Sequence, residues 1–215
     1  KFCFSLMVKN SIMLFCAHSD DAEIGCGGTI LKFKKDRKKI THILFSYGEK
    51  SHPHIKEKVI AKKREKETYN IDHILKRKTI FLGLKEGEFK NNIDETKKRI
   101  IEIIKKNKPE KIYTLSSLDP HPDHRAVNNI VMESLNEINY KGGVYSFEVW
   151  NLINENKPVS YVDITDTFKE KLNLLKHFKS QWLSIYIQLL PVIIRAKLYG
   201  YKNKCRYAEK FYKLR

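Results

Sequence analysis

The sequence predicts an α/β fold, with a Rossmann-like, mostly parallel sheet and helices on both faces. Three observations predict it. Short apolar runs alternate with longer stretches of helical periodicity, which is the pattern of a doubly wound sheet. The length of 215 residues suits one domain of this kind. Hydrophobic residues make up 41% of the chain, which supports a sizeable core and excludes a disordered or fibrous chain.

Each element follows from a local signal. Strands are expected at the apolar runs 11–17, 40–46, 79–82, 111–115, 143–149 and 159–164. Helices are expected at residues 29–37, 56–75, 94–106, 125–138 and 165–177. Asp94 and Thr165 are candidate helix caps, and Pro109 lies just beyond the third helix. Ligands of such sheets bind beyond the carboxyl ends of the strands, so the active site is expected there.

The longest apolar stretch, residues 185–194, contains Gln188 and Pro191 and predicts a buried helix. It is shorter than the roughly 18 apolar residues that cross a bilayer, so no transmembrane segment is expected. With no internal repeat and no linker, residues 1–215 are expected to form a single domain. Because the chain begins with Lys1, residues 1–10 are interpreted as an extension or as residues introduced by cloning. The four cysteines form no CxxC pair, which indicates reduced thiols and a cytoplasmic protein.

The charge balance is strongly basic. Lys and Arg number 42 against 25 Asp and Glu, a formal net charge of +17. Such an excess raises nucleic acid, an anionic membrane or an acidic substrate as partners. However, 34 of the 42 basic residues are lysines, which is typical of solvent-facing positions in a lysine-rich chain. The charge is therefore interpreted mainly as a solvated surface.

The first group of candidate site residues follows the first strand. His18 and Asp21 lie three residues apart and offer one nitrogen and one oxygen ligand, both of which zinc accepts. Asp20 lies between them and could act as a base while its neighbour binds a cation. Alternatively, the two carboxylates cap a helix and His18 is a histidine of the core. The local pattern leaves both interpretations open.

A glycine-rich segment after these residues raises a different function, the binding of a dinucleotide. Gly25 and Gly27 fit the opening of a GxGxxG loop, but Ile30 takes the position of its last glycine. Two carboxylates at the mouth of the strand would also repel a pyrophosphate. Both observations favour a divalent cation over a dinucleotide.

The second group follows the strand 111–115. His121 and His124 lie three residues apart, and Pro120 and Pro122 stiffen the backbone around them. Such a loop can exist without a metal, with Asp123 as the cap of the next helix and His121 in solvent. Both groups lie at strand ends of what should be one sheet, so they can converge. Together they predict a zinc site of two histidines and a carboxylate with one position left open.

These motifs resemble those of the PIG-L/LmbE-like zinc de-N-acetylases. The match comprises HSDDAEIGCGGT at 18–29, FLGLKEG at 81–87, HPDH at 121–124, YVDITD at 161–166 with SQ at 180–181, and YG at 199–200 with YAEKF at 207–211. The motifs occur in the order of the family, so the resemblance covers residues 12–211.

The resemblance implies a set of roles. His18, Asp21 and His124 would bind one Zn²⁺ per chain, and Asp20 would be the general base that deprotonates the attacking water. His121 would stabilise the oxyanion and help to protonate the leaving amine.

Further roles follow from the same resemblance. Asp123 would orient His121 and raise the pKa of its imidazole. Arg64 would reach the active site and contact the substrate, together with Glu86. Apart from the resemblance, the loops 48–54 and 150–158 follow strands and are expected to shape the sugar pocket, and His54 could contact substrate or metal from the first of them. The sequence departs from the family at two places. Ser19 stands where proline is usual, which makes the loop less stiff, and Lys85–Glu86 replaces Pro-Asp.

The resemblance implies a zinc-dependent hydrolase that removes the acetyl group from an N-acetylglucosamine-type sugar or its conjugate. A nucleic-acid partner is not expected. Such members are often trimers or hexamers, so a homo-oligomer is an expectation. Two alternatives stay open. One is zinc amide hydrolysis on a non-sugar substrate. The other is a non-catalytic module that binds polyanions through the basic clusters 32–39 and 62–64.

Overall fold

A computed structural model describes residues 10–50 and 56–215 and contains one seven-stranded sheet. The strands are β1 Ser11–Cys16, β2 Lys39–Leu44, β3 Arg77–Phe81, β4 Lys111–Leu115, β5 Gly143–Phe147, β6 Val159–Asp163 and β7 Ala208–Lys213. Their order in the sheet is β3-β2-β1-β4-β5-β7-β6. Strands β1 to β5 pair in parallel, and β7 runs antiparallel to both β5 and β6. The prediction of a mostly parallel sheet is confirmed.

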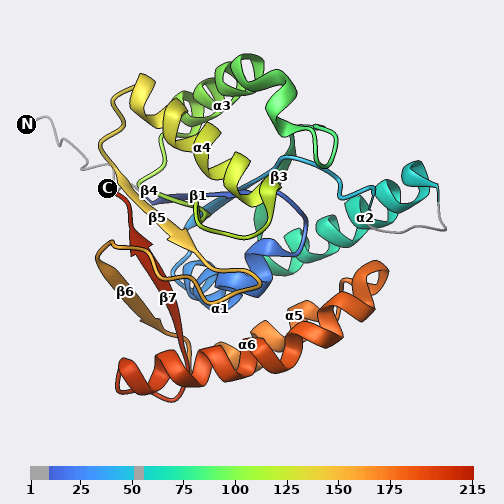
Figure 1. The fold of residues 1–215 in the computed structure, drawn as a ribbon. Coiled ribbons are helices and arrows are strands. Elements are labelled where there is room, and N and C mark those ends of the chain that lie inside the picture. The colour runs from blue at the N-terminus through green and yellow to red at the C-terminus, as the bar shows by residue number, and fades with distance from the viewer. Residues whose placement is uncertain (1–9, 51–55) are drawn as a thin grey trace, which may run out of the picture.

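Helices cover both faces of this sheet (Figure 1). They are α1 Asp21–Lys35, α2 Glu57–Leu75, α3 Ile93–Asn107, α4 Pro122–Glu137, α5 Phe168–Leu175 and α6 Trp182–Lys202, with short 3₁₀ turns at Phe89–Asn92 and Lys179–Gln181. Helices α3 and α4 pack together on one face, and α1 and α5 pack together on the other. Strand β1 lies between β2 and β4, and every one of its residues is buried. The chain order reverses at β1, and this switch point is where open α/β sheets bind ligands.

The first helix begins earlier than the sequence indicates. Helix α1 starts at Asp21 rather than at residue 29, and the glycine-rich segment is helical rather than a loop. The helix is kinked at Cys26, where φ is −140°. Beyond the kink, the carboxylate of Glu209 accepts hydrogen bonds from the backbone amides of Gly28 (2.9 Å) and Thr29 (2.8 Å). A side chain from the far end of the chain therefore caps the second part of the helix.

That capping residue lies on β7, a strand that the sequence analysis did not predict. Glu209 is buried and forms an ion pair with Lys171 of α5 at 2.6 Å. The Lys171 ammonium also donates to the carbonyl of Ile24 in α1. Buried charges are tolerated when they are paired and hydrogen-bonded in this way. The ion pair joins β7, α5 and α1 beneath the carboxyl end of β1.

Helix α6 differs from the buried helix predicted at residues 185–194. It is 21 residues long, and only one side of it is buried. Among the described residues, the segment Lys179–Lys202 is long and apolar enough to cross a membrane by length and composition alone, with 39% of the apolar window buried. The inward side chains Ile185, Val192 and Tyr199 pack into the domain.

The close packing of α1 gives a first prediction. A Cβ at Gly28 would lie 2.8 Å from two atoms of the Ile164 side chain, whereas a Cβ at Gly27 would have more room, with Cγ of Lys171 at 3.3 Å and Cβ of Glu23 at 3.9 Å. We expect Gly28→Ala to lower the free energy of unfolding by about 1–3 kcal/mol through overpacking. Gly27→Ala is the matched control, and its effect should stay below about 1 kcal/mol because alanine also favours the helix. Urea denaturation of both variants measures the difference, and equal stabilities would contradict the packing argument.

Candidate active site

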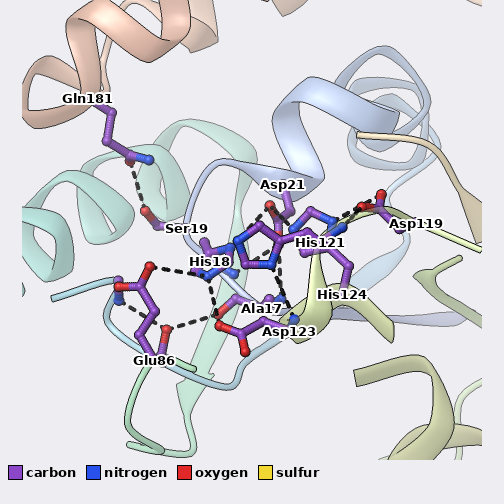
Figure 2. Close-up of polar contacts among 12 residues, drawn as sticks. Ala17, His18, Ser19, Asp21, Glu86, Asp119, His121, Asp123, His124 and Gln181 are labelled. Atoms are coloured by element: carbon purple, nitrogen blue, oxygen red, sulfur yellow. Dashed lines mark hydrogen bonds and ion pairs between the residues drawn. The ribbon is translucent and has the colours of Figure 1, made fainter. Parts of the chain in front are cut away.

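The candidate site lies where β1 and its neighbour β4 end. His18 and Asp20 follow β1, and Asp21 is the first residue of α1. His121 precedes α4, whose first turn carries His124. Because β1 and β4 are paired neighbours, their carboxyl ends bring the two groups together. Figure 2 shows the three imidazoles gathered around the Asp21 carboxylate. The convergence expected from the sequence is present in the structure.

Three buried side chains could hold a metal ion. One ligand atom from each of His18, Asp21 and His124 lies within 4.8 Å of the other two. The Oδ1 atom of Asp21 is 3.3 Å from Nε2 of His124 and 3.8 Å from Nδ1 of His18. Its other oxygen accepts hydrogen bonds of 2.9 Å from the backbone amides of Ala17 and His18, which fix the carboxylate.

The unsatisfied atoms of this group fit a cation. Oδ1 of Asp21, Nε2 of His18 and Nε2 of His124 are all buried and have no hydrogen-bond partner among the described residues. Oδ1 of Asp21 and Nε2 of His124 face each other at 3.3 Å, whereas Nε2 of His18 lies 3.5 Å from Asp123 and Nδ1 of the same ring lies 3.8 Å from Asp21. Buried polar atoms are normally paired, so the unpaired atoms of Asp21 and His124 indicate a missing ligand. Two imidazoles and one carboxylate are a donor set that Zn²⁺ accepts.

A second group of possible ligands consists of His18, His121 and Asp123. Its atoms are already engaged in the structure. Nδ1 of His121 accepts a hydrogen bond from the Asp123 amide at 3.2 Å. One Asp123 oxygen accepts from the Gly87 amide at 3.0 Å. The set of His18, Asp21 and His124 is the better candidate for a metal, because Asp21 and His124 present unpartnered atoms to each other.

Asp119 supports the site and was not assigned a role from the sequence. Its Oδ2 atom lies 3.1 Å from Nδ1 of His124, on the side of the ring away from Asp21. Its Oδ1 atom accepts a hydrogen bond from the His121 amide at 2.8 Å. A carboxylate behind a histidine ligand orients the ring and makes it a stronger donor. The signal available in the sequence was its place two residues before the first histidine of the HPDH motif.

The protonation of the histidines reflects the surrounding carboxylates. Burial acts to lower the pKa of His18, but the carboxylates of Asp123 and Asp21 outweigh it and raise that pKa to about 10. Burial likewise opposes the effect of Asp21 and Asp119 on His124, whose pKa is raised to about 9. Both rings therefore carry protons that balance the acidic charge when no cation is bound. A cation bound at these nitrogens has to displace those protons.

Asp20 is placed to act as a base. Its side chain is 3% exposed, and its Oδ2 atom has no hydrogen-bond partner among the described residues. Burial and the neighbouring charge of Asp21 raise the pKa of Asp20, and the Arg64 guanidinium opposes the rise. A desolvated carboxylate with a free oxygen can accept a proton more readily than an exposed one.

The expected role of Asp123 differs from what the structure shows. Its carboxylate faces His18, with 3.5 Å between Oδ2 and Nε2, and only its backbone amide contacts the ring of His121. Burial and the positive charges of His124 and His18 lower the pKa of His121, and the carboxylate of Asp123 opposes them, as the sequence predicts. Because Nδ1 of His121 accepts a hydrogen bond, the neutral ring carries its proton on Nε2. In this form His121 can donate a hydrogen bond.

Two adjoining cavities open at the site. A cavity of about 120 Å³ is lined by His18, Asp20, Arg64, Glu86, His121, Trp150, Gln181 and Ser184. A wider one of about 430 Å³ is lined by Asp119, Pro120, His121, Pro122, Trp150, Asn151 and Gln188. His121 and Trp150 border both cavities. Trp150 begins the 150–158 segment that the sequence predicts to shape the pocket, and it lines both cavities. Gln188 was not singled out as a site residue, because only the fold brings it to the metal-binding group.

Of the three residues predicted to contact the substrate, two line the smaller cavity. Arg64 on α2 is buried and lines the smaller cavity. Glu86 lines the same cavity, with one oxygen 3.7 Å from Nε2 of His18 and the other accepting from the Lys50 amide. His54 lies outside the described residues.

Three hydrogen bonds join this site and the neighbouring helix α2 to the turn that precedes α6. The Ser19 hydroxyl, at the position where proline was expected, donates to the Gln181 side chain at 3.1 Å. The Glu67 carboxylate of α2 accepts hydrogen bonds from the amide and hydroxyl of Ser180, at 2.8 and 2.6 Å. The serine thus replaces the rigidity of a proline with a contact to a distant segment (Figure 2).

Comparisons with known proteins agree with the motifs. The family model described as PIG-L, GlcNAc-PI de-N-acetylase, matches residues 13–135. A diacetylchitobiose deacetylase from Thermococcus kodakarensis is 26% identical over 212 residues, which cover 89% of this chain and 78% of the relative.

Solved structures show that the fold is shared. An N,N'-diacetylchitobiose deacetylase from Pyrococcus horikoshii superposes with a TM-score of 0.82 at 23% identity and covers 95% of this chain and 84% of its own. A 4-carboxy-2-hydroxymuconate hydratase from Pseudomonas putida superposes with a TM-score of 0.83 at 18% identity and covers 96% of each chain. The same fold therefore carries different reactions, and the reaction has to be argued from the site.

Proposed function

Because the chain belongs to the PIG-L family of GlcNAc-PI de-N-acetylases, we propose that it removes the acetyl group from an N-acetylglucosamine-type sugar or its conjugate by metal-dependent hydrolysis. One observation carries the proposal. Unpartnered ligand atoms of Asp21 and His124 lie beside the ring of His18, next to a cavity lined by Asp20, which has one unpartnered carboxylate oxygen. This combination fits amide hydrolysis by water, and it does not fit a binding module without chemistry.

The metal of the proposal is a single Zn²⁺ held by His18, Asp21 and His124. When bound, it would supply Lewis-acid chemistry, activating a water molecule and polarising the acetyl carbonyl. The protein itself fixes the Asp21 carboxylate through two backbone amides and orients His124 through Asp119. These contacts reduce the reorganisation needed when the cation enters.

Asp20 would move the proton of the reaction. Its carboxylate takes a proton from the attacking water while the oxygen of that water bonds to the carbonyl carbon. The bond between this carbon and the amide nitrogen then breaks. Asp20 returns the proton to the departing nitrogen, so that acetate and the free amine are released. The burial that raises the pKa of Asp20 helps the side chain to hold the proton between these steps.

His121 would stabilise the negative charge that develops on the carbonyl oxygen. Its neutral ring can donate a hydrogen bond from Nε2, because Nδ1 already accepts one from the Asp123 amide. A neutral imidazole that donates in this way cannot readily give up its only proton. The proposal therefore assigns the proton transfer to the amine to Asp20 rather than to His121.

Replacing His121 by alanine tests this role. We expect His121→Ala to bind zinc normally and to lose about 100- to 1,000-fold in kcat, the range found when one oxyanion donor is removed. His177→Ala is a control, because His177 is exposed. Zinc content and acetate release measure the two properties separately. An unchanged kcat would remove His121 from the mechanism.

The cavities suit an acetylated sugar. The smaller one can take the acetamido group beside Asp20, and the wider one extends past Trp150 toward Gln188. The indole of Trp150 offers an apolar platform for the C–H face of a sugar ring. Two of the proteins named above are diacetylchitobiose deacetylases, whose substrate is a disaccharide, and the two adjoining cavities offer space for a second unit.

An acetate-release screen tests the proposed function. The purified protein is incubated with N-acetylglucosamine, N,N'-diacetylchitobiose, N-acetylglucosaminides and N-acetylated amino acids, with and without a chelator. We expect release from at least one sugar and none after chelation. Release from the amino acids alone would favour the non-sugar alternative, and release that resists chelation would contradict the metal.

A further inference from the structure

The outward side of α6 is a mostly apolar surface that also carries the exposed Lys197, and we name it the α6 outer face. Figure 1 shows α6 at the margin of the molecule. The exposed side chains of this face are Trp182 (68% exposed), Leu183, Tyr186 (73%), Ile187 (60%), Leu190 (63%), Ile194, Leu198 and Tyr201. Their spacing of three and four residues places them on one side of the helix. Proteins rarely leave so many large apolar side chains together in water, so such a surface indicates a partner.

The other side of α6 ties the helix to the domain. Ile185, Val192 and Ala196 are buried, and α6 contacts β7. The guanidinium of Arg195 is buried and donates to the carbonyl of Val149 at 2.7 Å. A helix held in this way cannot cross a bilayer without removing these groups from the core. The α6 outer face is therefore suited to lie on a surface rather than to span one.

The charge around the face identifies the kind of surface. Residues 176–206 contain seven Lys and Arg and no Asp or Glu. Exposed lysines lie at both ends of the apolar stripe, with Lys179 before it and Lys202 and Lys204 after it. Trp182 and Tyr201 also lie near the two ends, and such amphipathic rings favour the headgroup level of a membrane. Two copies of this face brought together would place like charges side by side.

We propose that the α6 outer face binds the surface of an anionic membrane. The apolar side chains enter the boundary between headgroups and acyl chains, and the lysines at both ends contact lipid phosphates. Ser184 and Gln188 of the same helix line the two cavities of the candidate active site. The site therefore lies beside the membrane when the helix is bound. The membrane contact rests on this surface alone and does not depend on the reaction that the site performs.

Sedimentation with vesicles tests the proposal. The full chain is mixed with vesicles of phosphatidylcholine, with or without phosphatidylglycerol, and the bound fraction is measured. We expect binding to the anionic vesicles and weaker binding as salt is added. The double variant Ile187→Glu/Leu190→Glu should bind at least about tenfold more weakly, because two apolar side chains no longer enter the lipid. Val59→Glu is the matched control, since Val59 is an exposed (46%) apolar residue of helix α2.

A second measurement does not depend on whether the double variant folds. The chain has two tryptophans, so Trp150→Phe leaves Trp182 as the single indole. Its fluorescence should shift to the blue with anionic vesicles and stay unchanged with phosphatidylcholine alone. Absence of vesicle binding by the wild type, or binding that the double variant retains, would overturn the proposal. Light scattering that shows a wild-type oligomer without vesicle binding would assign the face to a second copy of the chain.

Discussion

Replacing His124 by alanine is expected to abolish both metal binding and deacetylation. The side chain is fully buried, and its Nε2 atom has no partner other than the site that it shares with Asp21 and His18. Removing it leaves two protein ligands, whereas catalytic zinc sites use three. Loss of a residue that merely supports a metal ligand already costs 10- to 100-fold. Loss of the ligand itself should therefore reduce acetate release by more than about 100-fold.

The measurement pairs metal analysis with the rate of acetate release. His73→Ala is a matched control because His73 is exposed on α2, and it should retain both metal and rate. Circular dichroism and thermal denaturation show whether His124→Ala is folded. A folded His124→Ala variant with full zinc occupancy would contradict the ligand set.

Asp20→Asn is expected to separate metal binding from turnover. Asparagine has the shape of aspartate, but its amide cannot take a proton from water. The ligand atoms of His18, Asp21 and His124 are untouched by this change, so the zinc content should equal that of the wild type. Loss of a general base typically costs 10²- to 10⁴-fold, so kcat should fall by about that factor.

A control variant and two contradicting results make the Asp20 experiment decisive. Asp36→Asn changes an exposed aspartate at the end of α1 and should leave kcat unaltered. A zinc-free Asp20→Asn variant would show that Asp20 is a ligand rather than the base. A zinc-loaded variant with nearly normal kcat would mean that another group accepts the proton.

Much of the fold could be predicted because the strands have strong local signals. The apolar runs at 11–17 and 111–115 became β1 and β4, the two strands that position the site. Strand β7 was missed because it carries the charged Glu209 into the interior. The burial of this carboxylate is made favourable by its ion pair with Lys171 and by the hydrogen bond from the Gly28 amide of α1. These partners are distant in sequence, so no local pattern shows them.

The residues of the candidate site that belong to sequence motifs could be predicted. His18, Asp21 and His124 stand in two short motifs, and adjacent parallel strands bring such motifs together. Asp119 was not assigned because its role comes from contacts that the fold creates. The side-chain direction of Asp123 also depends on Gly87, which comes from another loop and fixes the carboxylate toward His18.

The basic charge has a more specific interpretation in the structure than in the composition. The excess of lysine alone favours a solvated surface. The fold places lysines at both ends of the α6 outer face. Other residues of the same helix line the active-site cavities. The sequence predicts a buried helix at residues 185–194, but one side of α6 is exposed. Hydropathy alone does not tell which side of a helix packs against the domain.

Zinc reconstitution tests the metal-dependent mechanism most directly. The protein is freed of metal with a chelator, the chelator is removed, and Zn²⁺ is added in steps while bound zinc and acetate release are both measured. The mechanism predicts a metal-free protein with no measurable release, and a rate that rises in proportion to bound zinc up to one ion per chain. A metal-free protein that releases acetate at the full rate would contradict it.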